Sequence, residues 1–165
     1  MNSLKLRGIR ADEFEDYCAL FSDYDVVKMT SSWPFPMDED LCRKRFESVE
    51  VRSGQVSGIA NENQLIGVIG HKNGELGYVL GKPFWGNGIG TWAVAQKTRY
   101  VFEQVGHDMV KAQVWIDNPA SAAVLLKNGF DQIGGSRSFC VARNCEMDGI
   151  SFQLTRDKWE AMQSP

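Results

Sequence analysis

The sequence has few of the residues that build metal sites or disulfide frameworks. Its 165 residues include four cysteines and two histidines, and no two cysteines form a C-x-x-C pair. A zinc site needs closely spaced Cys and His ligands, so we expect reduced thiols and no metal. His71 and His107 are isolated in the sequence, and we expect both at the surface.

A basic excess and long apolar runs are also missing. Lys and Arg number 18 against 21 Asp and Glu, a formal charge of −3, whereas nucleic-acid-binding domains usually carry a basic face. The apolar stretches are far shorter than the ~20 residues of a membrane-spanning helix, and residues 1–7 lack the apolar segment of a secretory signal. We therefore expect a cytoplasmic protein without a nucleic-acid or membrane partner.

Length and composition favour one folded domain over residues 1–165. The hydrophobic fraction is 43%, and a chain of this length can bury a core without a metal or disulfide. Domains most often have about 100–150 residues. No repeat or flexible linker divides the chain.

Hydrophobic periodicity predicts an α/β (α+β) fold. An opening strand at Leu4–Ile9 precedes a helical stretch after Asp12, a loop at Ser31–Pro36 and a helix from Asp38 to about Val51. We expect strands at 56–60, 64–71, 75–80 and 110–116, helices at about 88–105 and 118–127, and extended segments at 130–133, 138–142 and 150–154. Short polar turns between the middle strands indicate antiparallel hairpins. The expected order is β-α-α-β-β-β-α-β-α-β-β, a mixed and mostly antiparallel sheet flanked by helices.

Three glycines alternate between a predicted strand and the long helix, at Gly86, Gly88 and Gly90. Glycine lets the backbone turn tightly and approach a ligand closely. The helix that follows adds free N–H groups and the positive end of its dipole. The segment therefore predicts a phosphate or pyrophosphate site, with an empty tight turn as the alternative.

The same segment also fits a dinucleotide-binding motif. Residues 88–93 match G-x-G-x-x-G/A, and Asp117 ends the next strand, where that fold places a ribose partner. However, Lys82–Trp85 separate the strand from the glycines, and antiparallel hairpins precede it. A dinucleotide-binding module is therefore the weaker interpretation, and the absence of Gly-Lys-Ser/Thr excludes a P-loop.

The order of the motifs resembles the GNAT N-acetyltransferases, and within them the ribosomal-protein-alanine N-acetyltransferase (RimJ/RimL-like) branch. The similarity covers nearly the whole chain and is carried by ELGYVL at 75–80, FWGNGIG at 84–90, NPAS at 118–121 and the segment 148–159. Gly88 and Gly90 occupy the family's glycine positions. Trp85 stands where Gln or Arg is general, a departure that is usual for this branch.

The resemblance implies acetyl-CoA as co-substrate. The pantetheine arm would bind along an exposed edge where the fourth strand splays from the fifth, and the pyrophosphate would bind at the glycine loop. The implied contacts are Tyr78, Val79 and Leu80 on the strand, and Trp85, Gly86, Asn87, Gly88, Ile89, Gly90 and Thr91 on the loop and helix. Asn118 would contact the pantetheine arm. Asparagine is also a good helix N-cap, and both roles can coexist.

The resemblance also implies the catalytic groups. Many relatives use a tyrosine as proton donor where this chain has Leu125, so the branch points instead to the hydroxyl of Ser121. A helix-stabilising role is the structural alternative for Ser121. Glu75 is the candidate base or water-relay residue, and a plain solvated carboxylate is equally compatible.

The acceptor would be a primary amine, attacked directly in a ternary complex. An α-amine with a pKa of about 7.7–8.0 is roughly one tenth neutral at pH 7, whereas a lysine amine is neutral in well under about one part in a thousand. A protein N-terminus or a small amine therefore fits better than an unactivated lysine. Trp33 and Phe35 in the loop could contact the acceptor or pin the loop to the core. A non-catalytic acyl-CoA sensor is the alternative function, and a homodimer is possible for this branch.

Overall fold

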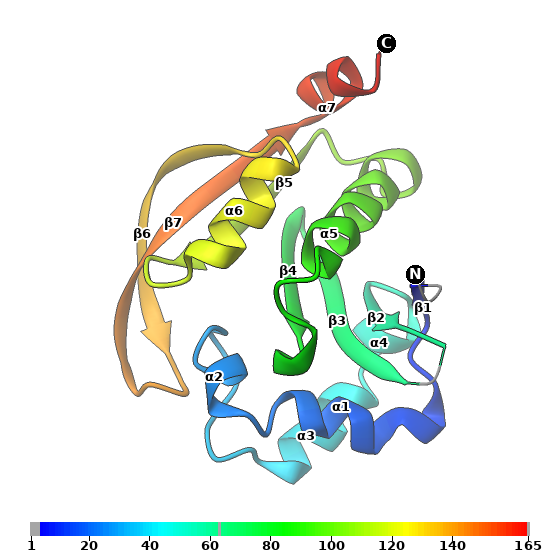
Figure 1. Ribbon diagram of the computed structural model, residues 1–165, viewed down its shortest axis with the longest axis vertical. Helices are drawn as coiled ribbons and strands as arrows, with labels where there is room; N and C mark the ends of the chain where they lie inside the picture. Colours follow the sequence, from blue (N-terminus) through cyan, green and yellow to red (C-terminus); the bar gives the residue numbers. More distant parts are fainter. Residues whose placement is uncertain (1–3, 63, 165) are drawn as a thin grey trace.

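Seven strands form one sheet in the order β1-β2-β3-β4-β5-β7-β6. The computed structural model describes residues 4–62 and 64–164, so the first three residues of the N-terminal segment lie outside it. All neighbouring strands pair antiparallel except β4 and β5, which are parallel. Helices lie on both faces of the sheet (Figure 1). The predicted mixed, mostly antiparallel α/β fold is therefore confirmed.

The elements follow the predicted order with some additions. In chain order they are β1 (Lys5–Arg7), η1 (Ala11–Glu13), α1 (Phe14–Leu20), α2 (Tyr24–Val27), α3 (Glu39–Phe46), α4 (Val49–Arg52), β2 (Val56–Ala60), β3 (Leu65–Lys72), β4 (Glu75–Leu80), η2 (Lys82–Phe84), α5 (Ile89–Tyr100), the π-helical turn η3 (Val101–Val105), β5 (Met109–Trp115), α6 (Pro119–Lys127), β6 (Asp131–Cys140), β7 (Cys145–Thr155) and α7 (Arg156–Gln163).

Several elements differ from the expectation, three of them clearly. The helix predicted from Asp38 to Val51 is divided into α3 and α4, because the Ser48 side chain accepts a hydrogen bond from the backbone of Val51 and starts a new helix. The extended segments 130–133 and 138–142 are one strand, β6, so the sheet ends in the two strands of the predicted order. The C-terminal helix α7 was not predicted.

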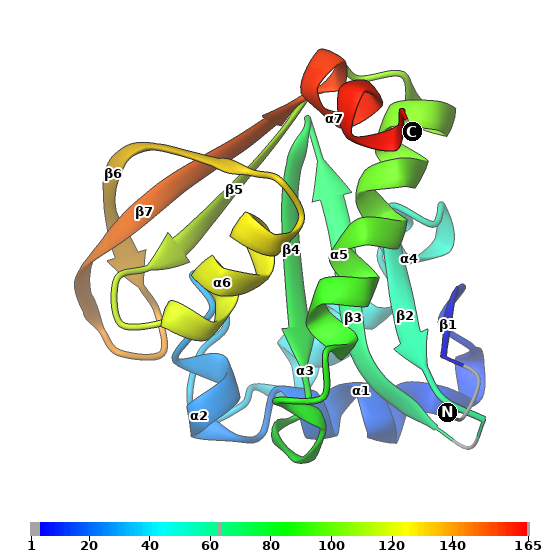
Figure 2. The same ribbon diagram turned by 45° about the horizontal axis from the view of Figure 1, so that its top comes forward.

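The strands β4 and β5 separate soon after they meet. They pair at a single register position, Glu75 with Lys111, and then diverge (Figure 2). On its other side β4 pairs with β3 from Glu75 to Leu80. One edge of β4 beyond Glu75 therefore has no strand partner, which is the arrangement expected for a splayed pair.

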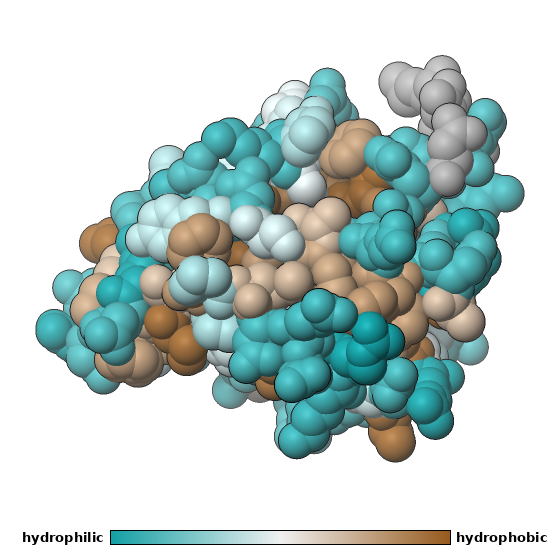
Figure 3. All heavy atoms as spheres, turned by 90° about the horizontal axis from the view of Figure 1, so that it is seen from below, coloured by the Kyte–Doolittle hydropathy of each residue, from teal (hydrophilic) through white to brown (hydrophobic). Residues whose placement is uncertain are grey.

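The side chains of β4 alternate between two hydrophobic cores. Tyr78 and Leu80 pack with residues of α5 and α6, such as Val94 and Leu125, whereas Val79 packs with the cluster of α1 and α3. Successive side chains of a strand point to opposite faces, so Glu75 and Gly77 share the face of Val79. The space-filling view from below shows apolar side chains gathered in the middle of that side of the molecule, with hydrophilic ones around them (Figure 3).

The described residues show neither a membrane span nor a metal cluster. None of their helices combines the length and the apolar character needed to cross a bilayer. No group of three His, Cys, Asp or Glu side chains in residues 4–62 and 64–164 is placed to hold a metal ion.

Candidate active site

A cleft of about 1100 Å³ lies where β4 and β5 diverge. All the predicted site residues except Asn87 line it: Glu75, Tyr78, Val79, Leu80, Trp85, Gly86, Gly88, Ile89, Gly90, Thr91, Asn118 and Ser121. The amide of Asn87 instead donates to the carbonyls of Phe84 and Trp85, at 3.4 and 2.9 Å. The fold thus brings residues from β4, the glycine loop, α5 and α6 to one place.

The glycine loop needs glycine at two positions for conformational reasons. Gly86 and Gly88 have φ angles of +76° and +74°, which other L-residues disfavour. A Cβ atom at either position would meet no atom within 4 Å, so space is not the constraint. Gly88 is the N-cap of α5 and supplies no side chain to its first turn. The backbone N–H groups there are left for another acceptor, and a pyrophosphate fits this set of donors.

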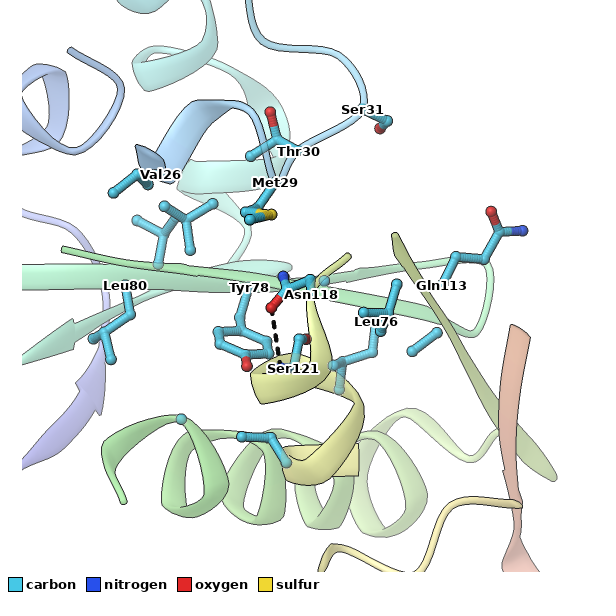
Figure 4. A pocket seen from close by; sticks show the side chains of 18 of the residues that line it. Val26, Met29, Thr30, Ser31, Leu76, Tyr78, Leu80, Gln113, Asn118 and Ser121 are labelled. Carbon is cyan, nitrogen blue, oxygen red and sulfur yellow. Dashed lines mark hydrogen bonds between the residues drawn. The ribbon is translucent and has the colours of Figure 1, made fainter. Parts of the chain in front are cut away.

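Two contacts hold the loop in place. The indole N–H of Trp85 donates to the carbonyl of Leu80 at 2.7 Å, so this side chain anchors the loop to the end of β4. The ammonium of Lys82 lies 2.5 Å from the carboxylate of Asp25 on α2. Hydrogen bonds from Lys28 and Lys82 lower the pKa of Asp25 to about 2. The glycine loop is therefore tied to α2, whose Val26 lies across β4 from Tyr78 (Figure 4).

Asn118, Ser121 and Tyr78 meet on the α6 side of β4 (Figure 4). The side-chain oxygen of Asn118 accepts a hydrogen bond from the backbone N–H of Ser121 at 3.2 Å, so Asn118 caps α6. Its amide N–H₂ group has no partner among the described residues. Burial raises the pKa of Tyr78, and the nearby Ser121 hydroxyl acts in the opposite direction. Leu125, at the family's tyrosine position, is buried in the core.

The Tyr78 hydroxyl also approaches the start of α5. A Cβ atom on Gly90 would lie 3.4 Å from this hydroxyl and 3.5 Å from Val124. The ring of Tyr78 therefore packs against Gly90 between α5 and α6, at distances that are ordinary van der Waals contacts. This packing holds the phenol beside Ser121.

Glu75 lies on the opposite face of β4 from Tyr78 and Ser121. Its side chain is exposed, and it has no hydrogen-bond or ion-pair partner in the part of the chain that the structure describes. Gly77 follows on the same face, where a Cβ atom would meet nothing within 4 Å. Gly77 pairs across the sheet with Gly70, and both line the cleft. Gly77 therefore leaves the cleft open next to Glu75, whereas a Cβ atom on Gly70 would lie 3.0 Å from a methyl group of Val56.

The aromatic residues of the Ser31–Pro36 loop have separate roles. Trp33 is buried, stacked on Phe21 with ring centres 3.6 Å apart, and its remaining surface lines the cleft. Phe35 is 42% exposed and contacts the ring of Tyr24. Trp33 therefore pins the loop to the core, as one of the two alternatives proposed.

Sequence reasoning missed an ion pair at the end of β5. Arg143, in the turn between β6 and β7, donates to both carboxylate oxygens of Asp117 at 2.6 and 3.1 Å. Its Nε also donates to the carbonyl of Lys28 at 2.8 Å. These hydrogen bonds lower the pKa of Asp117 and occupy the carboxylate that the dinucleotide interpretation needs for a ribose. Arg143 and Asp117 are 26 residues apart, and no sequence signal connects them.

The expectation of a surface His71 is wrong. The side chain is only 7% exposed, and its Nδ1 has no hydrogen-bond partner. Burial, followed by the nearby charge of Lys97, lowers the pKa of His71. Lys97 on α5 is itself buried, and burial lowers its pKa to about 8. Its ammonium donates to the Gly54 carbonyl and the Ser57 hydroxyl, each at 3.0 Å.

Comparisons with known proteins agree with this geometry. Residues 3–131 match the sequence model described as "Acetyltransferase (GNAT) domain". The chain is 25% identical over 166 residues to the SPbeta prophage-derived uncharacterized N-acetyltransferase YokL of Bacillus subtilis (strain 168), covering 96% of this chain and 93% of that protein.

Solved structures show the same fold. The ribosomal-protein-S5-alanine acetyltransferase from Vibrio fischeri superposes with a TM-score of 0.80 at 19% identity, covering 96% of each chain. The spermidine N-acetyltransferase from Vibrio cholerae, in complex with CoA and spermine, gives 0.78 at 13% identity, covering 95% of this chain and 98% of that one. Because the family's sequence model matches most of the chain, the chain belongs to the GNAT acetyltransferase family, and the predicted acetyl-CoA-dependent acetyltransferase is confirmed.

Proposed function

We propose that the chain transfers an acetyl group from acetyl-CoA to a primary amine, either a protein N-terminal α-amine or a small-molecule amine, by direct attack in a ternary complex. Residues 1–165 would act as one domain. The gap between β4 and β5 is the observation that supports this most strongly, because one cleft is lined from both faces of β4. A cofactor on the Tyr78 face and an amine on the Gly77 face would meet in that gap.

The chain offers three sets of groups to hold the cofactor. Bound acetyl-CoA supplies the acetyl group as a thioester. The unpaired edge of β4 at Tyr78–Leu80 can pair with the pantetheine amides as an added strand would. Backbone N–H groups from Gly86 to Thr91 receive the pyrophosphate, and the free amide N–H₂ of Asn118 donates to the pantetheine arm.

Ser121 is placed to assist the departing thiolate. Its hydroxyl would donate a hydrogen bond to the developing negative charge on sulfur. Tyr78 would help to orient that hydroxyl, because its phenol lies near Ser121 and its ring is in contact with Gly90. The phenol is neutral at physiological pH, because the ordinary pKa of tyrosine is already about 10 and burial raises the pKa of Tyr78 further, so no competing negative charge forms beside the thiolate.

The acceptor amine would lie on the other face of β4. Glu75 is exposed there without a partner, so it can accept a proton directly or through water. An α-amine with a pKa of about 7.7–8.0 is already partly neutral at pH 7. The proposed acceptor is therefore an amine of low pKa that needs only weak base assistance.

A thiol-release assay tests this proposal. Purified protein and acetyl-CoA are mixed with peptides bearing free N-termini, polyamines, aminoglycosides or amino acids, and NAD binding is measured in parallel. Amine-dependent release of thiol, with an acetylated product seen by mass spectrometry, is the expected result. Acetyl-CoA binding without release on any amine would favour a non-catalytic sensor and contradict the proposal.

The homodimer and the cytoplasmic location stay predictions. Analytical ultracentrifugation of the purified chain would test the first, and fractionation of cells that express it would test the second.

A further inference from the structure

The acceptor side of the cleft contains a cation without a counter-ion. Arg45 on α3 lines the cleft, and its guanidinium lies over the ring of Trp33, 4.2 Å from the ring centre. The side chain is half-buried, and burial lowers the pKa of its guanidinium. Within residues 4–62 and 64–164 no carboxylate forms an ion pair with it.

The guanidinium also has donors to spare. One terminal nitrogen donates to the Ser32 hydroxyl at 3.3 Å and the other to the Ser32 carbonyl at 3.0 Å. The Nε–H and the second N–H of each terminal nitrogen have no partner in the described part of the chain. A half-buried charge with unused donors is unfavourable by itself, and a bound anion would relieve both deficits.

The position of the guanidinium is fixed before any ligand arrives. Trp33 is held between Arg45 and Phe21, whose ring is nearly parallel to it at 12°. Ser32 accepts hydrogen bonds from the two terminal nitrogens of the guanidinium. A planar fork that is already oriented suits a bidentate carboxylate, because little rotational freedom is lost on binding.

Of the other charged residues on this side of β4, one carboxylate has no ion-pair partner. Lys72 and Glu50, which also line the cleft, form an ion pair with each other at 3.2 Å. Glu75, opposite Lys72 in the β3–β4 register, has no partner of its own among the described residues. Among the described residues that line this side of the cleft, Arg45 is therefore the cation and Glu75 the anion without an ion pair; Lys111, beside Glu75 in the β4–β5 register, does not line the cleft.

We propose that Arg45 binds a carboxylate of the acceptor, so that the preferred substrates are molecules carrying both a primary amine and a carboxylate. This inference rests on the proposed function and names its substrate class. The open space at Gly77 gives the acceptor room to extend from Arg45 toward the gap between β4 and β5. Its amine then lies on the face of Glu75.

Matched pairs of amines test the inference. One pair is a dipeptide and its C-terminal amide, and the other is an amidated peptide with Asp or Asn at its second position. Rates of thiol release are compared for the wild type, Arg45→Met and Arg43→Met. Arg43 is the matched control because it lies on the same helix, stacks on Phe14 at 4.1 Å and does not line the cleft. It already has a counter-ion in Glu39, at 3.3 Å.

We expect the wild type and Arg43→Met to prefer the carboxylate-bearing member of a pair by about tenfold or more in kcat/KM. Arg45→Met should lose that preference while its KM for acetyl-CoA stays unchanged. A preference within the dipeptide pair would show that Arg45 binds an α-carboxylate, and a preference within the Asp/Asn pair would show that it binds an acidic side chain. If Arg45→Met is less stable than Arg43→Met, Arg45→Lys keeps the cation and should retain part of the preference.

Two results would overturn the inference without touching the proposed function. One is amine-dependent turnover by the wild type with equal rates on both members of each pair. The other is an Arg45→Met variant that slows both members equally, which would assign Arg45 a structural role. Absence of turnover with every amine contradicts the proposed function and this inference together.

Discussion

The side-chain oxygen of Asn118 accepts the backbone N–H of Ser121 at 3.2 Å, and this bond closes the first turn of α6. It fixes the backbone of the residue proposed to assist the leaving thiolate. The same side chain keeps a free N–H₂ group at the cleft. Asn118 therefore caps α6, and its amide donors, which have no partner among the described residues, are available for the proposed contact with the pantetheine arm.

Substitutions at Asn118 should separate these two roles. Asp caps a helix about as well as Asn, so Asn118→Asp should keep the melting temperature but raise the KM for acetyl-CoA. Asn118→Ala should lose about 1 kcal/mol of stability and also raise that KM. Thermal unfolding and steady-state kinetics measure both effects.

Thr155→Ala is the control for the cap alone. Thr155 accepts the backbone N–H of Lys158 at 3.3 Å and caps α7, and it does not line the cleft. Its loss should lower stability and leave the KM for acetyl-CoA unchanged. An Asn118→Asp variant with wild-type affinity for acetyl-CoA would mean that Asn118 acts only as the N-cap of α6.

Gly88→Ala should weaken both the fold and cofactor binding. A left-handed residue with a Cβ atom costs about 1–2 kcal/mol, and Asn tolerates this conformation better than Ala. Gly88→Asn should therefore be the more stable of the two variants by urea unfolding. Gly8→Ala is the control, because a Cβ there also meets nothing within 4 Å but no positive φ opposes it. Equal stability of Gly88→Ala and Gly8→Ala would contradict the conformational argument.

Lys97 should make stability rise with pH. Its pKa is lowered from 10.5 to about 8 by burial, so between these values the unfolded chain binds more protons than the folded one. Stability therefore increases with pH across this window. Relative to Lys97→Met, the wild type should gain about 3 kcal/mol between pH 7 and pH 10.5.

Urea unfolding at several pH values measures this difference. Lys44→Met, which removes an exposed lysine of α3, is the control for the loss of a surface lysine. A difference between the wild type and Lys97→Met that does not change with pH would mean that Lys97 titrates as a solvated lysine.

Local sequence features predicted the central part of the site. The alternation in β4, the polar turn before it and the glycine spacing ahead of α5 are all contained in short windows, so these elements could be predicted without a structure, whereas the individual cofactor contacts were implied by the family resemblance and stay predictions. The predicted order of the strands along the chain also agrees with the structure. Sequence did not predict that β6 is continuous, because Gly134 and Gly135 are poor strand formers. Pairing with β7 across a bulge at Gln132/Gly134 overrides that preference.

The acceptor side depends on contacts between distant residues. The stack of Arg45 on Trp33 requires α3 to pack against the loop before it. Burial of His71 and Lys97 likewise follows from the packing of α5 on the sheet, which a polar side chain in the sequence does not indicate.

The most direct test of the proposed mechanism compares the wild type with Ser121→Ala. Amine-dependent thiol release gives kcat, and isothermal titration gives the Kd for acetyl-CoA. Alanine keeps the backbone N–H that Asn118 accepts, so the variant should fold and bind acetyl-CoA normally while kcat falls by about 10²-fold or more. An unchanged kcat would contradict the role of the Ser121 hydroxyl in transfer.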